Sequence, residues 1–165
     1  MANERELEEK FWSAVKSDRT MMLGLAGVEH SHARPMTAQL DGERGPIWFF
    51  ASRDNELVQK IAGGQEAVAT FASKGHDLFA EVHGGLSIDN DRARIDRLWN
   101  RFVAAWFPGG KDDPTLCLIR VDGREGEYWD NSGVQGIKYA FQAAKAYMQG
   151  TKPATDEKQN AKVAL

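Results

Sequence analysis

The sequence predicts a mainly β protein with flanking helices, in which antiparallel strands form a closed or partly closed barrel. About seven short apolar segments are separated by glycine, proline and small polar residues, as strands are by turns. About four helical segments lie among them without alternating one-for-one with the strands, which argues against a doubly wound parallel sheet. With 165 residues, of which 42% are hydrophobic, the chain is long enough for one domain with a single core.

An amphipathic helix of about three turns is predicted at the N-terminus. Asn3 is a suitable N-cap, and Glu6 follows three residues later, as in a capping box. Leu7, Phe11 and Val15 then recur at every fourth position. These three side chains therefore share one face of the helix.

Strands are predicted where apolar segments without a helical period are bounded by turn residues. The third of these segments contains Trp48, Phe49 and Phe50 and is rich in aromatic residues. The predicted strands cover residues 20–26, 32–40, 46–51, 67–72, 78–88, 116–121 and 126–129.

Three further helices are predicted. A short one begins in the polar cluster 52–56 and ends at two glycines after Ile61. A longer one is capped by Asp89 or Asp91 and carries apolar residues at helical spacing as far as Trp106.

The last helix opens at Gly133 and is stopped by Gly150 and Pro153. Its predicted apolar face consists of Ile137, Phe141, Ala144 and Met148. Residues 1–150 are predicted to form the single domain, and residues 151–165 a polar, partly mobile C-terminal tail.

Composition restricts the classes of partner and compartment. The net charge of −3 gives no reason to expect nucleic-acid binding. The arginines between residues 92 and 101 alternate with acidic residues and are interpreted as a solvated helix face. Neither a signal-peptide h-region nor an apolar run of about 20 residues is visible, so no membrane association is expected. The single cysteine, Cys117, is predicted to be a packed core thiol, and a reducing, cytoplasmic location is expected.

Most motifs for common chemistries are missing from the sequence. Neither the P-loop nor the Rossmann fingerprint is present. His30 and His32 would share one face of a strand and could bind a metal, but a third ligand is not obvious. Asp112 and Asp113 are interpreted as a loop and cap, not as an acid/base pair.

The junction between the aromatic strand and the short helix can be interpreted in two ways. A helix start presents unpaired amides, and Ser52, Arg53 and Asn55 could add hydrogen bonds and charge, as a phosphate site requires. Read alone, the same cluster is more often an ordinary N-cap.

Several segments, in their order and spacing, resemble the pyridoxamine-phosphate-oxidase-like flavin proteins. The resemblance covers nearly the whole chain and is closest to the bacterial general-stress-protein subgroup. The segments are Ala33-Arg34-Pro35-Met36-Thr37, Ile47-Trp48-Phe49-Phe50-Ala51-Ser52, Leu98-Trp99 through Ala105-Trp106-Phe107-Pro108-Gly109-Gly110, Asp112-Asp113-Pro114, Glu127-Tyr128-Trp129-Asp130 and Asn160-Ala161-Lys162-Val163.

The resemblance implies a Greek-key-like, antiparallel split β-barrel that forms a homodimer with FMN at the interface. In the family, one strand lies against the flavin ring, the next strand leads into the phosphate site, and a tryptophan packs on the flavin from the partner subunit. The cofactor-binding residues implied here are His32, Arg34, Pro35, Met36, Phe50, Ala51, Ser52, Arg53, Asn55, Trp106 and Trp129.

One departure concerns the phosphate. Family members often carry a lysine or an Arg-Lys pair inside the helix after the aromatic strand, and the aligned residues here are Glu56 and Leu57. Arg53, Lys60 or backbone amides are the candidates to compensate.

Three functions remain open at this point. The first is an FMN-dependent oxidoreductase that acts on a small-molecule substrate of unknown identity and is linked to the stress response. The second is a non-catalytic flavin carrier or sensor. The third keeps the barrel but holds haem or no cofactor, motivated only by the histidines. No catalytic residue is assigned, and pyridoxine-phosphate oxidase activity is not expected because basic residues for a second phosphate cannot be placed.

Overall fold

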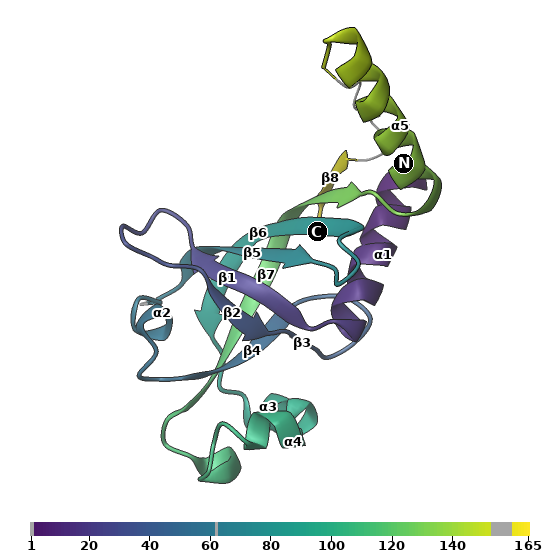
Figure 1. Cartoon of the computed structure of the whole chain (residues 1–165). Helices are drawn as coiled ribbons and strands as arrows, with labels where there is room; N and C mark the ends of the chain where they lie inside the picture. Colours follow the sequence, from purple (N-terminus) through teal and green to yellow (C-terminus); the bar gives the residue numbers. More distant parts are fainter. Residues whose placement is uncertain (1, 62, 153–159) are drawn as a thin grey trace.

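The computed structural model describes residues 2–61, 63–152 and 160–165. Within them, eight strands form one antiparallel sheet that curls into a nearly closed barrel with flanking helices (Figure 1). This confirms the predicted fold class. The strands are β1 (Thr20–Leu25), β2 (Arg34–Thr37), β3 (Gln39–Leu40), β4 (Ile47–Ser52), β5 (Gln65–Ala72), β6 (Leu78–Ile88), β7 (Leu116–Asp130) and β8 (Asn160–Ala164).

The sheet order explains how the barrel closes. The order is β2-β1-β5-β6-β7-β4-β3, with β8 paired to β7. The two end strands, β2 and β3, are separated only by Ala38, whose amide donates to the carbonyl of Arg19 at 2.6 Å. The chain therefore passes directly from one edge of the sheet to the other. β2 also contacts β4, and the place where these two strands meet without pairing is called the seam below.

Five α-helices lie within the described residues. The N-terminal helix is present and covers one side of the barrel, where Leu7, Phe11 and Val15 are buried. It begins at Ala2, so Asn3 lies inside the helix and the prediction of Asn3 as its N-cap is wrong. The Phe11 ring stacks on Tyr128 with a centroid distance of 5.1 Å. The helices are α1 (Ala2–Ser17), α2 (Glu56–Gln59), α3 (Arg92–Leu98), α4 (Arg101–Ala104) and α5 (Gly133–Gln149), and a 3-10 turn covers Gly110–Asp112.

A second, smaller core lies outside the barrel, under α3 and α4. It contains Trp48 from the outer face of β4 and Ile95 from α3. The Arg94 and Arg120 guanidinium groups lie over the Trp48 ring, at 4.6 and 5.5 Å from its centroid. The interpretation of the arginines on α3 as a solvated face is therefore wrong for Arg94.

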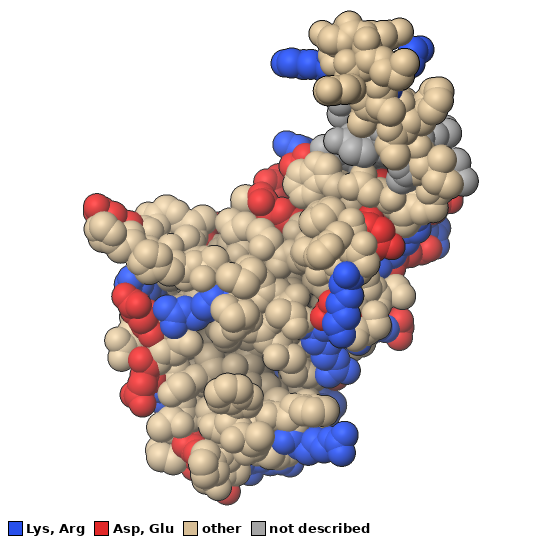
Figure 2. All heavy atoms as spheres, viewed as in Figure 1, with Lys and Arg blue, Asp and Glu red and all other residues tan. Residues whose placement is uncertain are grey.

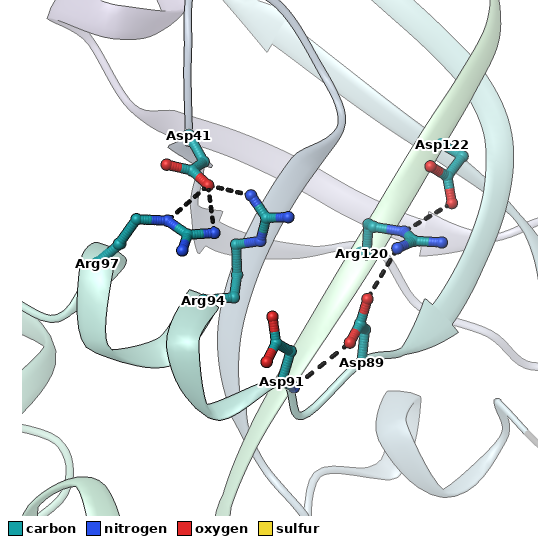
Figure 3. A network of polar contacts seen from close by, with 7 residues as sticks. All are labelled: Asp41, Asp89, Asp91, Arg94, Arg97, Arg120 and Asp122. Carbon is teal, nitrogen blue, oxygen red and sulfur yellow. Dashed lines mark hydrogen bonds and ion pairs between the residues drawn. The ribbon is translucent and has the colours of Figure 1, made fainter.

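Asp41 fixes α3 to the barrel through two arginines of that helix. Its carboxylate accepts hydrogen bonds from Arg94 and Arg97 (Figure 3). The hydrogen bond from Arg97, together with the positive charges of both arginines, holds the pKa of Asp41 below its usual value, although partial burial opposes this. On the other side of Trp48, Arg120 bridges Asp89 at 2.7 Å and Asp122 at 2.9 Å.

The prediction of one long helix ending near Trp106 is wrong, because the chain divides it into α3 and α4. Trp99 leaves the helical conformation with φ −61° and ψ 132°. Asn100 then acts as a new N-cap, because its side chain accepts from the amides of Phe102 and Val103. The apolar spacing continues on both sides of Asn100, but asparagine is a better helix cap than a helix former, so one helix ends and another begins there.

The prediction of two final strands is also wrong, since β7 runs without interruption from residue 116 to 130. Gly123, in the gap between the two predicted strands, lies opposite Gly84, where the register shifts between His83 and Gly84. A Cβ on Gly84 would lie 2.1 Å from the Asp122 carbonyl oxygen, so the close approach of the strands requires glycine here.

The predicted tail contains a strand. Residues 160–164 form β8, which pairs with β7 and places Ala161 opposite Tyr128. The sheet thus includes residues beyond the predicted domain limit at residue 150, and the mobile-tail prediction is wrong for β8. Pro153, predicted as a helix stop, lies outside the described residues.

The helix α5 extends away from the barrel (Figure 1). It ends as predicted at Gly150, which adopts φ 63°. Among the side chains of this helix that the structure describes, that of Ala146 is buried, at about 180° around the axis from Ile137. The predicted apolar face is therefore exposed, with 73% of Ile137, 71% of Phe141 and 85% of Met148 accessible.

Two other predictions concern burial and membranes. Cys117 is fully buried in the barrel core, as predicted, and burial raises the pKa of its thiol. In the described part of the chain, no helix combines the length and the apolar character needed to cross a membrane.

Candidate functional site

Arg34 lies at the seam, beside the start of α2. Arg34 pairs with Leu23 across β1 and β2, whereas Pro35 pairs with Met22. Side chains alternate along a strand, so Arg34 lies on the Leu23 side of the sheet, which faces the core, and Pro35 on the outer side. Met36 packs against the barrel core from the same side as Arg34.

The Arg34 guanidinium links β2 to α2 across the seam. Its Nη1 donates to the Asn55 side-chain oxygen at 2.6 Å, and its Nη2 lies 3.6 Å from a carboxylate oxygen of Glu56. Among the described residues, the buried Nε of Arg34 has no hydrogen-bond partner. One donor of a half-buried arginine is thus left unused at this position.

Three amides at the start of α2 already have acceptors within the chain. The Arg53 amide donates to the Thr115 carbonyl at 2.7 Å, and the Asp54 amide to the Ser52 hydroxyl at 3.3 Å. The Leu57 amide donates to the side chain of Asn55, which is thus the N-cap of α2, within the predicted helix-start cluster 52–56. The expectation that backbone amides near Ser52 form an anion hole is therefore not supported.

Positive side chains gather instead around the first residue of α2. Lys60 Nζ lies 3.2 Å from one oxygen of Glu56, while Arg34 approaches the other. The hydrogen bond from Lys60 lowers the pKa of Glu56, and the nearby charges of Lys60, Arg34 and His32 act in the same direction. His32 precedes β2 and is exposed. The seam therefore holds several cationic groups around one carboxylate.

The predicted ring-lining residues of β4 lie on opposite faces of the strand. Phe50 points outward and packs edge-on against Trp99, with ring centroids 5.9 Å apart. Ala51 points inward and is buried in the barrel core. These two side chains cannot line one wall, so a ligand could contact this part of β4 only through its backbone or through one face.

The two predicted tryptophans lie away from the seam. Trp106 follows α4 and is 83% exposed. Trp129 lies on β7 and lines a surface groove of about 700 Å³ together with Met22 and Phe79. Since Met22 is the strand partner of Pro35, this groove begins next to the outer face of β2. Within one chain, the structure brings Arg34 and Asn55 together and leaves Trp106 and Trp129 elsewhere.

Sequence reasoning missed the apolar lining of this groove. Met22 is 40% exposed on the outward-facing side of β1, between buried Met21 and Leu23. An apolar residue at an outward position of an alternating strand is the signal that could have indicated it.

The structure removes the geometric basis of the metal hypothesis. His30 and His32 do not lie on a strand, and His30 adopts φ 58° in a turn. In residues 2–61, 63–152 and 160–165, no three of His, Cys, Asp and Glu gather as a metal site requires.

Comparison with known proteins identifies the relatives of the chain. General stress protein 26 of Bacillus subtilis (strain 168) is 24% identical over 123 residues, covering 73% of this chain and 86% of its own length. The solved structure of a general stress FMN/FAD binding protein from Xanthomonas citri matches with a TM-score of 0.74 and 56% identity, covering 78% of this chain and 92% of that chain. A candidate general stress protein 26 from Jannaschia sp. CCS1 matches with a TM-score of 0.76 and 30% identity over 100% of both chains.

The family can be assigned from a separate match. The model of the family described as pyridoxamine 5'-phosphate oxidase like matches residues 6–154. That range includes most of α1, strands β1 to β7 and the helices α2 to α5. The chain therefore belongs to the pyridoxamine 5'-phosphate oxidase-like family, as the resemblance in its sequence predicted.

Proposed function

We propose that this chain binds FMN, with the phosphate at the seam beside Arg34 and the ring along β2. Arg34 is the observation that carries the proposal. Arg34 is half-buried and lies on β2 at the seam, and among the described residues its buried donor Nε has no hydrogen-bond partner. Buried polar groups in native proteins usually have partners, so an unpaired guanidinium nitrogen indicates a missing acceptor. A phosphate oxygen suits a guanidinium well.

The residues present fit a phosphate-bearing flavin in a specific way. Arg34 and Lys60 offer charged donors in place of the engaged amides, while Asn55 holds Arg34 in position. Pro35 offers apolar surface on the outer face of β2, beside its exposed strand partner Met22. A flat, largely apolar ring system with a charged tail requires such a combination. The similarity to the Xanthomonas citri FMN/FAD binding protein supports the same ligand class.

A bound flavin supplies electron-transfer chemistry to its protein. The residues of this chain would then bind the flavin, orient it and limit access to it. We propose oxidoreductase activity on a small molecule of unknown identity, linked to the stress response as the names of the relatives suggest. The alternative, a non-catalytic carrier or sensor, is favoured by the strand residues Pro35, Met36 and Phe50, which carry no acid or base.

We further propose that the flavin lies between two copies of this chain. Arg34 lies on β2 and Trp129 on β7, and β1, β5 and β6 separate these strands in the sheet, so Trp129 would contact a flavin held mainly by the other copy. The exposed apolar face of α5 supports pairing of copies. The exposed large side chains of α5 are Ile137, Phe141, Tyr147 and Met148. At roughly 150 Å² each on both copies they would bury about 1,200 Å², the lower end of specific interfaces.

We propose the cytoplasm as the compartment of this protein. Its lone cysteine, Cys117, is a buried thiol, which is compatible with a reducing compartment. Fractionation of cells that express the protein tests this directly.

The test is an absorbance scan of purified protein followed by titration with FMN. A flavin-type spectrum and saturable binding are expected, and Trp129→Ala is expected to weaken binding about tenfold or more, as loss of a stacked aromatic contact does. Binding unchanged in Trp129→Ala would remove that residue from the site. A protein that binds no flavin would contradict the whole proposal.

Turnover separates the two proposed roles. Loaded protein is mixed with NADH, NADPH or another reductant, and flavin absorbance is followed over time. Reduction and reoxidation at a useful rate favour the oxidoreductase. Tight binding without reduction by any donor favours the carrier or sensor.

A further inference from the structure

We infer that Glu56 lowers the affinity of this chain for the phosphate of FMN, because its carboxylate occupies the same two cations, Arg34 and Lys60, that would hold that phosphate. This inference rests on the proposed flavin site. It adds a residue that opposes binding and so sets which flavin the chain prefers.

The geometry places one carboxylate between two cations. One oxygen of Glu56 lies 3.2 Å from Lys60 Nζ, and the other lies 3.6 Å from Arg34 Nη2. The side chains of Arg34 and Lys60 are 31% and 30% exposed, whereas that of Glu56 is 61% exposed. The cations are thus held partly inside the surface, and the carboxylate covers them from the solvent side.

Arg34 and Lys60 are the cations in contact with Glu56 at this position, and three nearby amides are already engaged. The amides of Arg53, Asp54 and Leu57 donate within the chain. The Arg53 side chain is exposed. A phosphate at this position must therefore share Arg34 and Lys60 with Glu56 or displace Glu56 from them.

The electrostatic consequence has a definite sign. A phosphate monoester carries about −1.5 to −2 charges at pH 7. Placing it beside the charge of Glu56 adds repulsion and removes two favourable contacts that Glu56 makes in the free protein. Surface ion pairs are individually weak, so the combined penalty is about three- to tenfold in affinity. Riboflavin has the same ring without the phosphate and should not experience it.

The experiment measures dissociation constants for FMN and for riboflavin in wild-type protein and in Glu56→Gln. This variant removes the charge and keeps the size of the side chain. FMN is expected to bind about three- to tenfold more tightly to the variant, with riboflavin changed less than about twofold. The gain should shrink as salt is raised from about 0.05 M to 0.5 M, because screening weakens exposed charge interactions.

Glu9→Gln is the matched control. Glu9 also forms an exposed i,i+4 ion pair, with Arg5, but it lies on α1. The control makes the same change in net charge, so an equal gain in Glu9→Gln would show a long-range effect and overturn the inference. Lys60→Gln tests the opposite direction and should weaken FMN binding several-fold without affecting riboflavin.

The outcomes distinguish this inference from the proposed function. If wild-type protein binds both flavins and Glu56→Gln leaves the ratio of the two constants unchanged, the inference is wrong and flavin binding stands. If Glu56→Gln tightens both ligands equally, Glu56 acts on the ring site and the inference is also wrong. If wild-type protein binds neither flavin, the proposed function fails first.

Discussion

The first and last helices have the same kind of sequence pattern and opposite environments. In α1, apolar residues recur every fourth position, and Leu7, Phe11 and Val15 are buried against the barrel. In α5, Ile137 and Phe141 have the same spacing but are more than two-thirds exposed. Figure 2 shows α5 as an arm with a largely uncharged surface that stands clear of the barrel. An amphipathic pattern therefore identifies the apolar face of a helix, but it does not identify what packs against that face.

The apolar face of α3 is buried less than that of α1 and more than that of α5. Its apolar residues Ile95 and Leu98 reach the smaller core, and Asp41 holds its arginines. Ion pairs thus supplement a short apolar face that buries less than that of α1.

Replacing Phe11 with alanine should have the largest effect on folding stability. The ring is fully buried and contacts Phe71 and Tyr128. Removing a buried phenyl group costs about 3–5 kcal/mol in the free energy of unfolding. Urea denaturation measures this, with Ser13→Ala on the exposed side of α1 as control. A loss below about 1 kcal/mol would show that α1 is not integral to the core.

The double change Ile137→Gln and Phe141→Gln should act on association and leave folding intact. Loss of two central interface residues is expected to weaken pairing of two copies about 100-fold or more, measured by sedimentation. The unfolding free energy of the single chain should change by less than about 0.5 kcal/mol, because both side chains are exposed in it.

Gln149→Ala, at an exposed position of α5 about 120° around the helix axis from Ile137, is the control. Unchanged association in the double variant, or a wild-type protein that stays monomeric, would contradict pairing through α5. A large loss of stability would instead indicate that this face is covered within one chain.

Asp41→Asn should weaken the attachment of α3 by about 1–2 kcal/mol at pH 7, as loss of charge-assisted hydrogen bonds does. The pKa of Asp41 is lowered in the folded protein. Its stabilisation is therefore present above its unfolded pKa of about 3.9 and is lost as pH falls through the lower folded value. The difference from wild type should shrink towards pH 3 in urea titrations. Asp112→Asn, which removes an exposed pair with Arg92, should cause no measurable change. An equal loss in both variants would argue against a special role for Asp41.

Tyr128→Phe should have the smallest effect, between no change and about 1 kcal/mol of added stability. The ring packs on Phe11, whereas its buried hydroxyl has no hydrogen-bond partner among the described residues. Removing an unpaired polar group from a core relieves its desolvation cost. Thermal unfolding measures the change. A loss above 1 kcal/mol would reveal a partner for this hydroxyl.

Much of the fold could be predicted because its signals are local. The strand periods, the N-cap at Asn55 and the Gly150 helix end each depend on residues within a few positions of one another. The predictions failed where two distant segments decide the outcome. The strand β7 is continuous because β6 and β8 pair along it, and β8 is a strand because β7 offers it an edge.

The candidate site was predicted less completely for the same reason. The sequence indicated Arg34 and the β4–α2 junction, but it could not show that the local amides are already paired or that Phe50 and Ala51 face opposite ways. These facts depend on the register of β4 with β7 and on which face the outer helices cover.

The sequence by itself determined the antiparallel β class, the amphipathic helices, the buried thiol and the family, because these depend on composition, spacing and short-range order. Only the tertiary structure decided that Arg34 and Lys60 meet around Glu56, and that α1 is covered while α5 is not. Contacts between segments distant in sequence depend on how the sheet closes into a barrel. Short-range sequence patterns do not predict that closure.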